Sequence, residues 1–324
     1  GGHTAAIAPV VLPDRLDLLL SLPDGIKRYT VKVSAKELND EINRFRARLE
    51  KRTTHQYKRH AKNIYSWLIE PMEKDLQAQK IDTLVFIPDD GLRTIPLAAL
   101  YDGKDFLIAR YSIATTPGLT LTDPKPLPRK NMKLLVACLT ESVQGFPPLT
   151  DVEGEVTKLN SLYDGAILEN SQFTQANVKQ ELDDTPYSIV HIASHGKFQS
   201  DVNSTFLLTY DGKLNMDTLE GFMASTTYRD QPVELLTLSA CQTAVGDDKA
   251  ALGLGGIAVK AGARSALATL WYINDQASSQ LITDFYTNLK NQDASKAQAL
   301  RDAQLAMIKD PRFSHPSYWA PFLL

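Results

Sequence analysis

Apolar positions in the first 80 residues predict a hairpin followed by helices. Two β-prone runs, Asp17–Leu22 and Tyr29–Val33, flank a Pro-Asp-Gly turn signal, which is typical of antiparallel strands joined tightly. Leucine, isoleucine and phenylalanine then recur every three or four residues from Ser34 to Arg52, so a helix that Ser34 caps is expected there. A second helix is expected from His55 to Gln79, with a kink at Pro71.

A polar, proline-rich segment divides the chain. Before it, Thr83–Ile87 and Leu107–Ala114 are the last strands expected in this part. The segment itself, Thr122–Lys130, reads TDPKPLPRK and is the clearest boundary signal in the sequence. We therefore expect an α+β N-terminal subdomain over residues 1–130 and a second domain over residues 131–324.

After this boundary, short apolar strands alternate with helical segments. Such alternation favours an α/β fold, in which a mainly parallel sheet is flanked by helices. The expected strands are Leu134–Ala137, Tyr187–Ala193, Leu235–Ala240 and Ser265–Leu270, and the expected helices are Asp151–Leu162, Leu254–Ala261 and Ser278–Leu289.

Composition places the chain among ordinary globular proteins and narrows the choice of partners. Its 324 residues are 43% hydrophobic, which excludes disordered and collagen-like classes. The 35 basic and 38 acidic residues give a formal net charge of −3, so nucleic acid is not expected as a direct partner. The longest apolar stretch, Ala250–Val259, is too short to cross a bilayer, which needs about 20 apolar residues. We expect no membrane association.

The cysteines bear on the compartment in which the protein resides, and the first residues bear on whether the chain is a fragment. Two cysteines, Cys138 and Cys241, provide no disulfide framework, which favours the cytoplasm. The chain starts with Gly-Gly-His-Thr, without a methionine or a signal peptide, so we expect a fragment of a longer protein. Nothing in the sequence calls for a cofactor.

Candidate chemistry gathers where three predicted strands end. His195 follows Tyr187–Ala193, Cys241 follows Leu235–Ala240, and Asp275 comes shortly after Ser265–Leu270. In an open α/β sheet, sites form beyond the carboxyl ends of parallel strands. If these strands are parallel neighbours, a base, a thiol and a carboxylate converge on one edge of the sheet.

A histidine beside a cysteine can carry out nucleophilic catalysis. The imidazole of His195 can take the proton of the Cys241 thiol, because a nearby imidazolium stabilises the thiolate. Gly196 lacks a Cβ, so its N–H, together with that of Cys241, can approach and stabilise a tetrahedral oxyanion. This combination predicts acyl transfer, in the form of peptide-bond hydrolysis.

Each of these residues also has a structural interpretation. A lone cysteine at the end of an apolar strand usually serves packing, which is the favoured role for Cys138. Asn274 or Asp275 can instead cap the following helix. His191 and His195 do not suit a metal site, because four residues of strand span about 13 Å. We therefore expect no metal and place His191 in the core.

Several segments together resemble the CHAT domain, a bacterial branch of the caspase and separase proteases. His195 and Cys241 are 46 positions apart, close to the spacing of about 50 in caspases. The match covers nearly the whole chain, in the order of the family. The segments that carry the resemblance are IVHIASHG at 189–196, LTLSACQT at 236–243, AGARS at 261–265, IPDDGLRTIPLAAL at 87–100 and the closing strand HPSYWAPF at 315–322.

The resemblance implies a caspase-like core with His195 as base and Cys241 as nucleophile. Residues 1–130 would then be the N-terminal subdomain of the family, which resembles an inactive protease. In caspase relatives, the loop that corresponds to Trp271–Asp275 builds the primary specificity pocket. An acidic residue there suits a basic P1 side chain, because carboxylates pair well with Arg and Lys.

The resemblance leaves the details of the pocket open. Within the pocket loop, Trp271, Asn274 and Asp275 are the candidate substrate-binding residues, and Asp247 and Asp248 are rival carboxylates for the same role. The nucleophile is followed by Gln-Thr and not by the Arg-Gly of caspases, so a preference for Asp at P1 is not expected.

These observations predict a CHAT-type cysteine endopeptidase of protein substrates, regulated by a repeat domain, an activator protein or another signal. Family members commonly carry helical repeats before this domain, and this sequence contains none. The alternative is a catalytically silent scaffold with the same fold. An α/β hydrolase is disfavoured, because no Gly-x-Ser-x-Gly motif is present.

Overall fold

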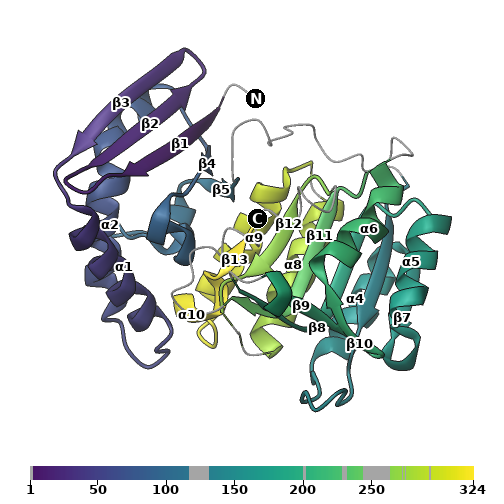
Figure 1. Cartoon of the computed structure of the whole chain (residues 1–324). Coiled ribbons are helices and arrows are strands. Elements are labelled where there is room, and N and C mark those ends of the chain that lie inside the picture. Colours follow the sequence, from purple (N-terminus) through teal and green to yellow (C-terminus); the bar gives the residue numbers. More distant parts are fainter. Residues whose placement is uncertain are drawn as a thin grey trace. The chain divides into compact units, whose positions relative to one another are not determined.

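The computed structural model describes residues 3–116, 131–199, 202–227, 232–243, 263–271, 273, 275–291 and 293–324 (Figure 1). The chain forms two compact units. Unit 1 comprises Gly1–Pro124 and Leu300–Pro321, and unit 2 comprises Lys125–Ala299 and Phe322–Leu324. Among the helices in these ranges, none is long and apolar enough to cross a membrane.

Unit 1 contains a five-stranded sheet in the order β3-β2-β1-β4-β5. The first three strands form an antiparallel meander, and β4 and β5 add to it in parallel. The predicted hairpin is confirmed as β2 and β3, whereas β1 was not predicted. The strands are β1 Thr4–Val11, β2 Leu16–Leu22, β3 Gly25–Val31, β4 Thr83–Phe86 and β5 Ser112–Thr115.

Helices of unit 1 cover one side of this sheet (Figure 1). Ser34 caps α1 as predicted, because its side chain accepts a hydrogen bond from the N–H of Glu37 at 3.1 Å. The predicted second helix is broken around Pro71 into two α-helices joined by a 3-10 turn. The helical elements are α1 Ala35–Leu49, α2 Tyr57–Leu68, η1 Glu70–Met72, α3 Glu73–Ala78, η2 Asp90–Thr94, η3 Leu97–Ala99, η4 Leu107–Ala109 and α10 Pro316–Trp319.

The predicted strand Leu107–Ala114 is wrong in its first half. Residues 107–109 form the 3-10 turn η4, and the strand β5 begins only at Ser112. The reason is a distant contact: the Arg301 guanidinium donates to the carbonyls of Ile108 at 2.8 Å and Ala109 at 2.7 Å. These carbonyls are therefore satisfied outside any sheet.

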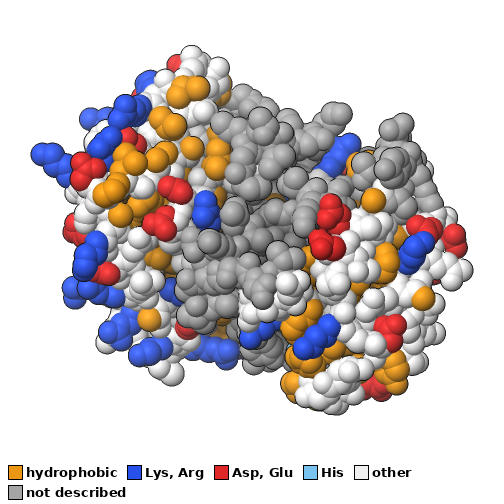
Figure 2. All heavy atoms as spheres, in the orientation of Figure 1, with side chains coloured by type: hydrophobic (Ala, Val, Ile, Leu, Met, Phe, Trp, Pro, Cys, Tyr) orange, Lys and Arg blue, Asp and Glu red, His pale blue; other side chains and the backbone are white. Residues whose placement is uncertain are grey.

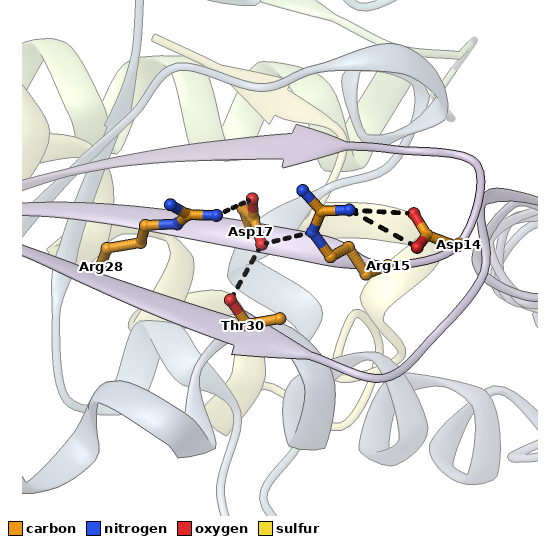
Figure 3. A network of polar contacts seen from close by, with 5 residues as sticks. All are labelled: Asp14, Arg15, Asp17, Arg28 and Thr30. Carbon is orange, nitrogen blue, oxygen red and sulfur yellow. Dashed lines mark hydrogen bonds and ion pairs between the residues drawn. The ribbon is translucent and has the colours of Figure 1, made fainter.

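A buried aspartate links β2 and β3 on the sheet (Figure 3). Asp17 accepts hydrogen bonds from Arg28 at 2.9 Å and Thr30 at 3.1 Å, and it forms an ion pair with Arg15 at 3.4 Å. Burial alone would raise the pKa of Asp17, but the Thr30 hydrogen bond and the charges of Arg28 and Arg15 outweigh it and lower the pKa. Arg15 also pairs with Asp14. The cations on this part of the sheet are thus neutralised locally.

Unit 2 contains the mainly parallel sheet that the sequence predicts. Strands β7, β6, β8, β11 and β12 are parallel neighbours, and β13 closes the edge in antiparallel orientation. The hairpin of β9 and β10 pairs with the last part of β8. The strands are β6 Lys133–Cys138, β7 Asp164–Glu169, β8 Ile189–Phe198, β9 Phe206–Thr209, β10 Gly212–Asn215, β11 Leu235–Thr243, β12 Ala266–Thr269 and β13 Phe322–Leu323.

Helices flank this sheet (Figure 1), and apolar side chains from strands and helices form one continuous core. That core includes Leu135, Ile192 and Leu238 from three neighbouring strands, each at most 1% exposed. The remaining helical elements among the described residues are α4 Val152–Leu162, η6 Asn170–Gln172, α5 Gln175–Asp184, η7 Val202–Ser204, α6 Met216–Thr227, α8 Asp275–Asn291 and α9 Lys296–Lys309.

Three predicted strands require correction, and one predicted helix lies outside the described residues. The strands expected to end at Ala193 and Ala240 continue to Phe198 and Thr243. The closing strand expected at 315–322 is mostly the helix α10, and only β13 at its end is extended. The expected helix Leu254–Ala261 lies outside the described residues.

Candidate active site

The pairing of β8 with β11 brings the two candidate catalytic residues together. The strands remain in register up to Ser239, which lies opposite Ala193, and the pairing resumes with Cys241 opposite Gly196. Two residues of β8, one of them His195, therefore lie opposite a single residue of β11. Such an irregularity redirects a side chain and is frequent beside active sites. The prediction that these strands are parallel neighbours is confirmed, but both residues lie within the strands and not after them.

The two β8 residues at this irregularity have different environments. Ser194 is fully buried, and its hydroxyl donates to the carbonyl of Leu208 on β9 at 2.6 Å. His195, by contrast, is half-buried. The serine therefore fixes the backbone to the core, and the histidine keeps access to solvent.

A backbone carbonyl orients the ring of His195. Its Nε2 lies 2.7 Å from the carbonyl oxygen of Pro147. Because a carbonyl can only accept, Nε2 carries the hydrogen, and in the neutral imidazole Nδ1 is then the basic nitrogen. The ring of Phe146 lies next to the imidazole, with 5.2 Å between the ring centroids. The base is therefore held in one tautomer and one orientation.

A tight turn after β6 presents Phe146 and Pro147 to the histidine. Gln144 and Gly145 both have left-handed backbone angles, with φ of 54° and 81°, and Val143 pairs with Phe146 across them. A turn with positive φ at both central residues is of type I′ and strongly favours glycine. The hydroxyl of Ser142 donates to the carbonyl of Phe146 at 2.7 Å and closes the turn.

Asn170 anchors the start of this loop. Its side-chain oxygen accepts from the N–H groups of Thr140 at 2.8 Å and Glu141 at 3.3 Å, and its amide donates to the Thr140 hydroxyl at 2.8 Å. Asn170 itself has a φ of 51°, a left-handed conformation that Asn tolerates better than most residues. Neither this residue nor Pro147 was predicted from the sequence. An asparagine directly after a strand and a Gln-Gly pair were the only local signals.

A buried polar cluster lies further back on the same two strands. His191 Nδ1 lies 3.0 Å from the hydroxyl of Tyr286, which donates to Thr237 Oγ1 at 2.7 Å. His191 Nε2 lies 3.3 Å from a carboxylate oxygen of Glu155. Burial raises the pKa of Tyr286 well above its usual value, so the phenol remains a donor. The cluster ties β8 and β11 to α4 and α8.

The second cysteine and the second histidine have structural surroundings. Cys138 is fully buried, and burial, together with nearby carboxylates, raises the pKa of its thiol to about 12. A thiol with such a pKa is not a nucleophile at neutral pH. His191 is occupied by the buried cluster. Within the described ranges, no three His, Cys, Asp or Glu side chains are grouped as a metal site would require.

Only two of the candidate pocket residues, Trp271 and Asp275, lie in the described part of the chain. Trp271, two residues beyond β12, is buried and 6% exposed. Asp275 is the first residue of α8, so it immediately follows the loop that the resemblance assigns to the pocket. Asn274, Asp247 and Asp248 lie outside the described residues.

The fold defines the class to which this protein belongs. Its structure is similar to that of separase in the Saccharomyces cerevisiae separase–securin complex, with a TM-score of 0.56 and 8% identity. The similarity covers 99% of this chain and 30% of that chain. The chain therefore has the caspase-like protease fold that the sequence predicted.

A family model identifies the chain further. The CHAT domain model matches residues 58–324, and the chain belongs to this family. A weaker structural similarity, with a TM-score of 0.46 and 8% identity, relates 89% of the chain to 75% of the complex of Porphyromonas gingivalis RgpB pro- and mature domains. No curated protein matches the chain by sequence.

Proposed function

We propose that this protein is a CHAT-type cysteine endopeptidase that uses Cys241 as nucleophile and His195 as base. The observation that carries the proposal is the irregular pairing of β8 with β11. It puts the backbone of Cys241 beside Gly196, directly after a half-buried histidine whose Nε2 is already engaged by a carbonyl. The division into an N-terminal subdomain, 1–130, and a catalytic domain, 131–324, belongs to the same proposal, as does a cytoplasmic location.

The proposed reaction proceeds in two steps. Nδ1 of His195 takes the proton of the Cys241 thiol, and the thiolate attacks the carbonyl carbon of the scissile peptide bond. The N–H groups of Gly196 and Cys241 stabilise the oxyanion. The intermediate expels the amine, which takes the proton from His195, and a thioester remains on Cys241. Water, deprotonated by His195, then hydrolyses the thioester and restores the free thiol.

The proposed substrates are proteins with Arg or Lys at P1. Asp275 supports this preference, because it begins α8 after the strand β12, and β12 is the neighbour of β11. A carboxylate at that position pairs with a basic side chain. Trp271 and Asn274, which precede Asp275 in the sequence, are proposed to contact the substrate as well, and Asp247 and Asp248 are the rival carboxylates.

A protein partner or another signal is proposed to control the activity. Separase, whose fold this chain shares, was crystallised in complex with securin. By analogy, an activator or inhibitor protein or a repeat domain attached to this chain would govern access of substrate to Cys241.

Cleavage of fluorogenic peptides tests the proposal. Substrates with Arg or Lys at P1 are compared with an Asp substrate, for the wild type and for Cys241→Ala, His195→Ala and the matched control Cys138→Ala. We expect cleavage after basic residues that the first two substitutions abolish and that Cys138→Ala retains. Replacing Asp275, Asp247 and Asp248 by Asn, one at a time, then identifies the P1 carboxylate.

An active-site probe distinguishes an inhibited enzyme from a scaffold. An acyloxymethyl ketone with a basic P1 residue should label Cys241 and leave Cys138 unmodified, as peptide mass spectrometry would show. No cleavage together with no labelling of Cys241, in the presence of the natural partner, would establish the alternative of a silent scaffold.

A further inference from the structure

The end of α1, the turn after it and the start of α2 carry an unusual concentration of positive charge. Residues 44–62 contain eight Arg or Lys residues and one acidic residue, a net charge of +7. The whole chain has a formal charge of −3, so the remainder carries −10. The surface is therefore a local basic feature on an otherwise acidic protein.

Six of these cations form what we call the basic surface. They are exposed, except for Arg48, which is half-buried. Figure 2 shows Lys and Arg side chains gathered at the lower left, over α1 and the turn that follows it. The members of the basic surface are Arg48, Lys51, Arg52, Lys58, Arg59 and Lys62.

Carboxylates within the described part of the chain do not neutralise the basic surface. Arg44 pairs with Glu41, and Arg46 pairs with Glu50, the only acidic residue of the segment. None of the six members takes part in an ion pair with a described residue. On the sheet of the same unit, by contrast, Arg15 and Arg28 are both paired with Asp17. The cations of the basic surface therefore differ in their pairing from these two arginines of the sheet.

Two members of the basic surface are placed where they destabilise their own helix. Lys58 and Arg59 lie in the first turn of α2, which contains no acidic residue. Gln56, at the N-cap, makes no capping hydrogen bond with its side chain. The N-terminus of a helix carries a partial positive charge, which disfavours cations and favours carboxylates. Helix stability thus gives no reason for these two residues.

Two of the cations of the basic surface lie over aromatic rings. The Arg52 guanidinium lies over the ring of Tyr318 at 5.0 Å, and the Lys58 ammonium lies over the ring of Tyr101 at 5.5 Å. Such contacts hold the side chains in place while leaving their charge unneutralised. Less conformational entropy is then lost when an anion binds.

We propose that the basic surface binds a short acidic segment of a partner protein. Six cations along two neighbouring helix ends match a few closely spaced carboxylates. A long nucleic acid would extend beyond this surface onto a protein that carries −10 elsewhere, where it would be repelled. The two rings are already covered by Arg52 and Lys58, so they do not offer stacking platforms for bases. This proposal is independent of catalysis by Cys241.

Fluorescence anisotropy of the full chain tests the proposal. The probes are a fluorescein-labelled peptide of about ten residues, rich in Glu, and an RNA duplex of the same net charge, each titrated with protein at about 50 and 200 mM salt. We expect saturable binding of the peptide that weakens at the higher salt concentration. The charge-reversed variant Lys58→Glu with Arg59→Glu should bind the peptide about tenfold more weakly.

A matched variant and a melting curve make the test specific. Lys32→Glu with Lys74→Glu changes the net charge equally at exposed positions outside the segment 44–62, and it should alter the affinity less than about twofold. The variant at Lys58 and Arg59 should melt at or above the wild-type temperature, because acidic residues suit the start of a helix. Lost binding then cannot come from unfolding.

Three outcomes would overturn the proposal. The first is the absence of saturable peptide binding by the wild type. The second is an equal loss of affinity in both double variants, which would mean that only the overall charge matters. The third is tighter binding of the RNA duplex than of the peptide, which would assign the surface to nucleic acid.

Discussion

Removing the carboxylate of Glu155 should destabilise unit 2 more than any other single change in its polar core. Glu155 and His191 have side chains that are 3% and 0% exposed, and they lie 3.3 Å apart. Because the Tyr286 hydroxyl donates to Thr237, His191 Nδ1 must donate to Tyr286. His191 Nε2 therefore faces the Glu155 carboxylate at ion-pair distance, without a hydrogen bond between the two atoms.

The magnitude follows from the burial of this pair. In Glu155→Ala, His191 Nε2 loses the carboxylate that it faces and remains without access to water. Removing one member of a buried pair costs about 3–5 kcal/mol, and the long contact here places the value near 3 kcal/mol. In Glu155→Gln, the amide can donate to Nε2, so the cost should be about 1 kcal/mol.

Native-state hydrogen exchange, measured by mass spectrometry in increasing urea, reports this stability locally. The peptides that contain β8 and β11 should lose protection in Glu155→Ala, while peptides from β1 and β2 in unit 1 serve as the internal reference. A loss below about 1 kcal/mol in Glu155→Ala would refute the reasoning. Equal losses for Ala and Gln would also refute it, because Gln keeps the shape of Glu and a donor toward Nε2, so the effect would then come from the lost negative charge alone.

Three further predictions follow from single residues. The imidazole of His315 caps α10 and donates a hydrogen bond to the carbonyl of Thr54. Burial lowers the pKa of His315 below the usual 6.5, so the folded state resists a proton that the unfolded chain accepts. The free energy of unfolding should therefore decrease as the pH falls below about 6.5. His315→Asn, which keeps a cap, should show a smaller difference than the wild type between the urea midpoints at pH 7.5 and 5.5. An unchanged difference would rule out His315 as the origin of the pH dependence. Gly165 has a φ of 158°, and a Cβ at this position would lie 1.8 Å from the carbonyl oxygen of Leu134. Gly165→Ala should therefore lower the free energy of unfolding by about 3 kcal/mol or more in urea titrations. The control Gly154→Ala, where a Cβ meets no neighbour, should change it by less than about 0.5 kcal/mol. If the proposed dyad is correct, Asn170→Gly, which keeps the left-handed backbone but frees the loop, should lower kcat about tenfold and shift the pH profile of kcat with little effect on KM; a profile identical to that of the wild type would remove Asn170 from the positioning of His195.

Local signals in the sequence sufficed for elements that are stabilised by their own residues. Ser34 caps its helix through a neighbour three residues away, and the break around Pro71 follows from the missing N–H and the ring of proline. The parallel order of the strands that carry His195 and Cys241 was also predictable, since strands that alternate with helices pair in this way.

Elements that depend on distant partners were missed or misjudged. β1 contains Pro9 and several alanines, which are weak strand formers, and it is held by pairing with β2 and β4. The extension of β8 past Gly196 depends on two distant partners, because Gly196 pairs with Cys241 of β11 and with Leu207 of β9. A Ser-His-Gly sequence alone indicates a turn, and only these pairings make it a strand. The same limit applies to the candidate site, where Pro147 contributes a carbonyl that any residue could supply.

The discontinuous composition of unit 1 imposes an order on its folding during synthesis. Residues 1–124 leave the ribosome first, but the unit also requires residues 300–321, which follow the 175 residues Lys125–Ala299. At about 5–20 residues per second, the first segment waits roughly 10–35 s for its missing part. During this interval Phe106 lacks Trp319, which is fully buried in the finished unit with 5.0 Å between the two ring centroids. A nascent chain that exposes apolar surface for this long is a natural client of chaperones, and a translational pause after residue 124 would lengthen its dependence on them.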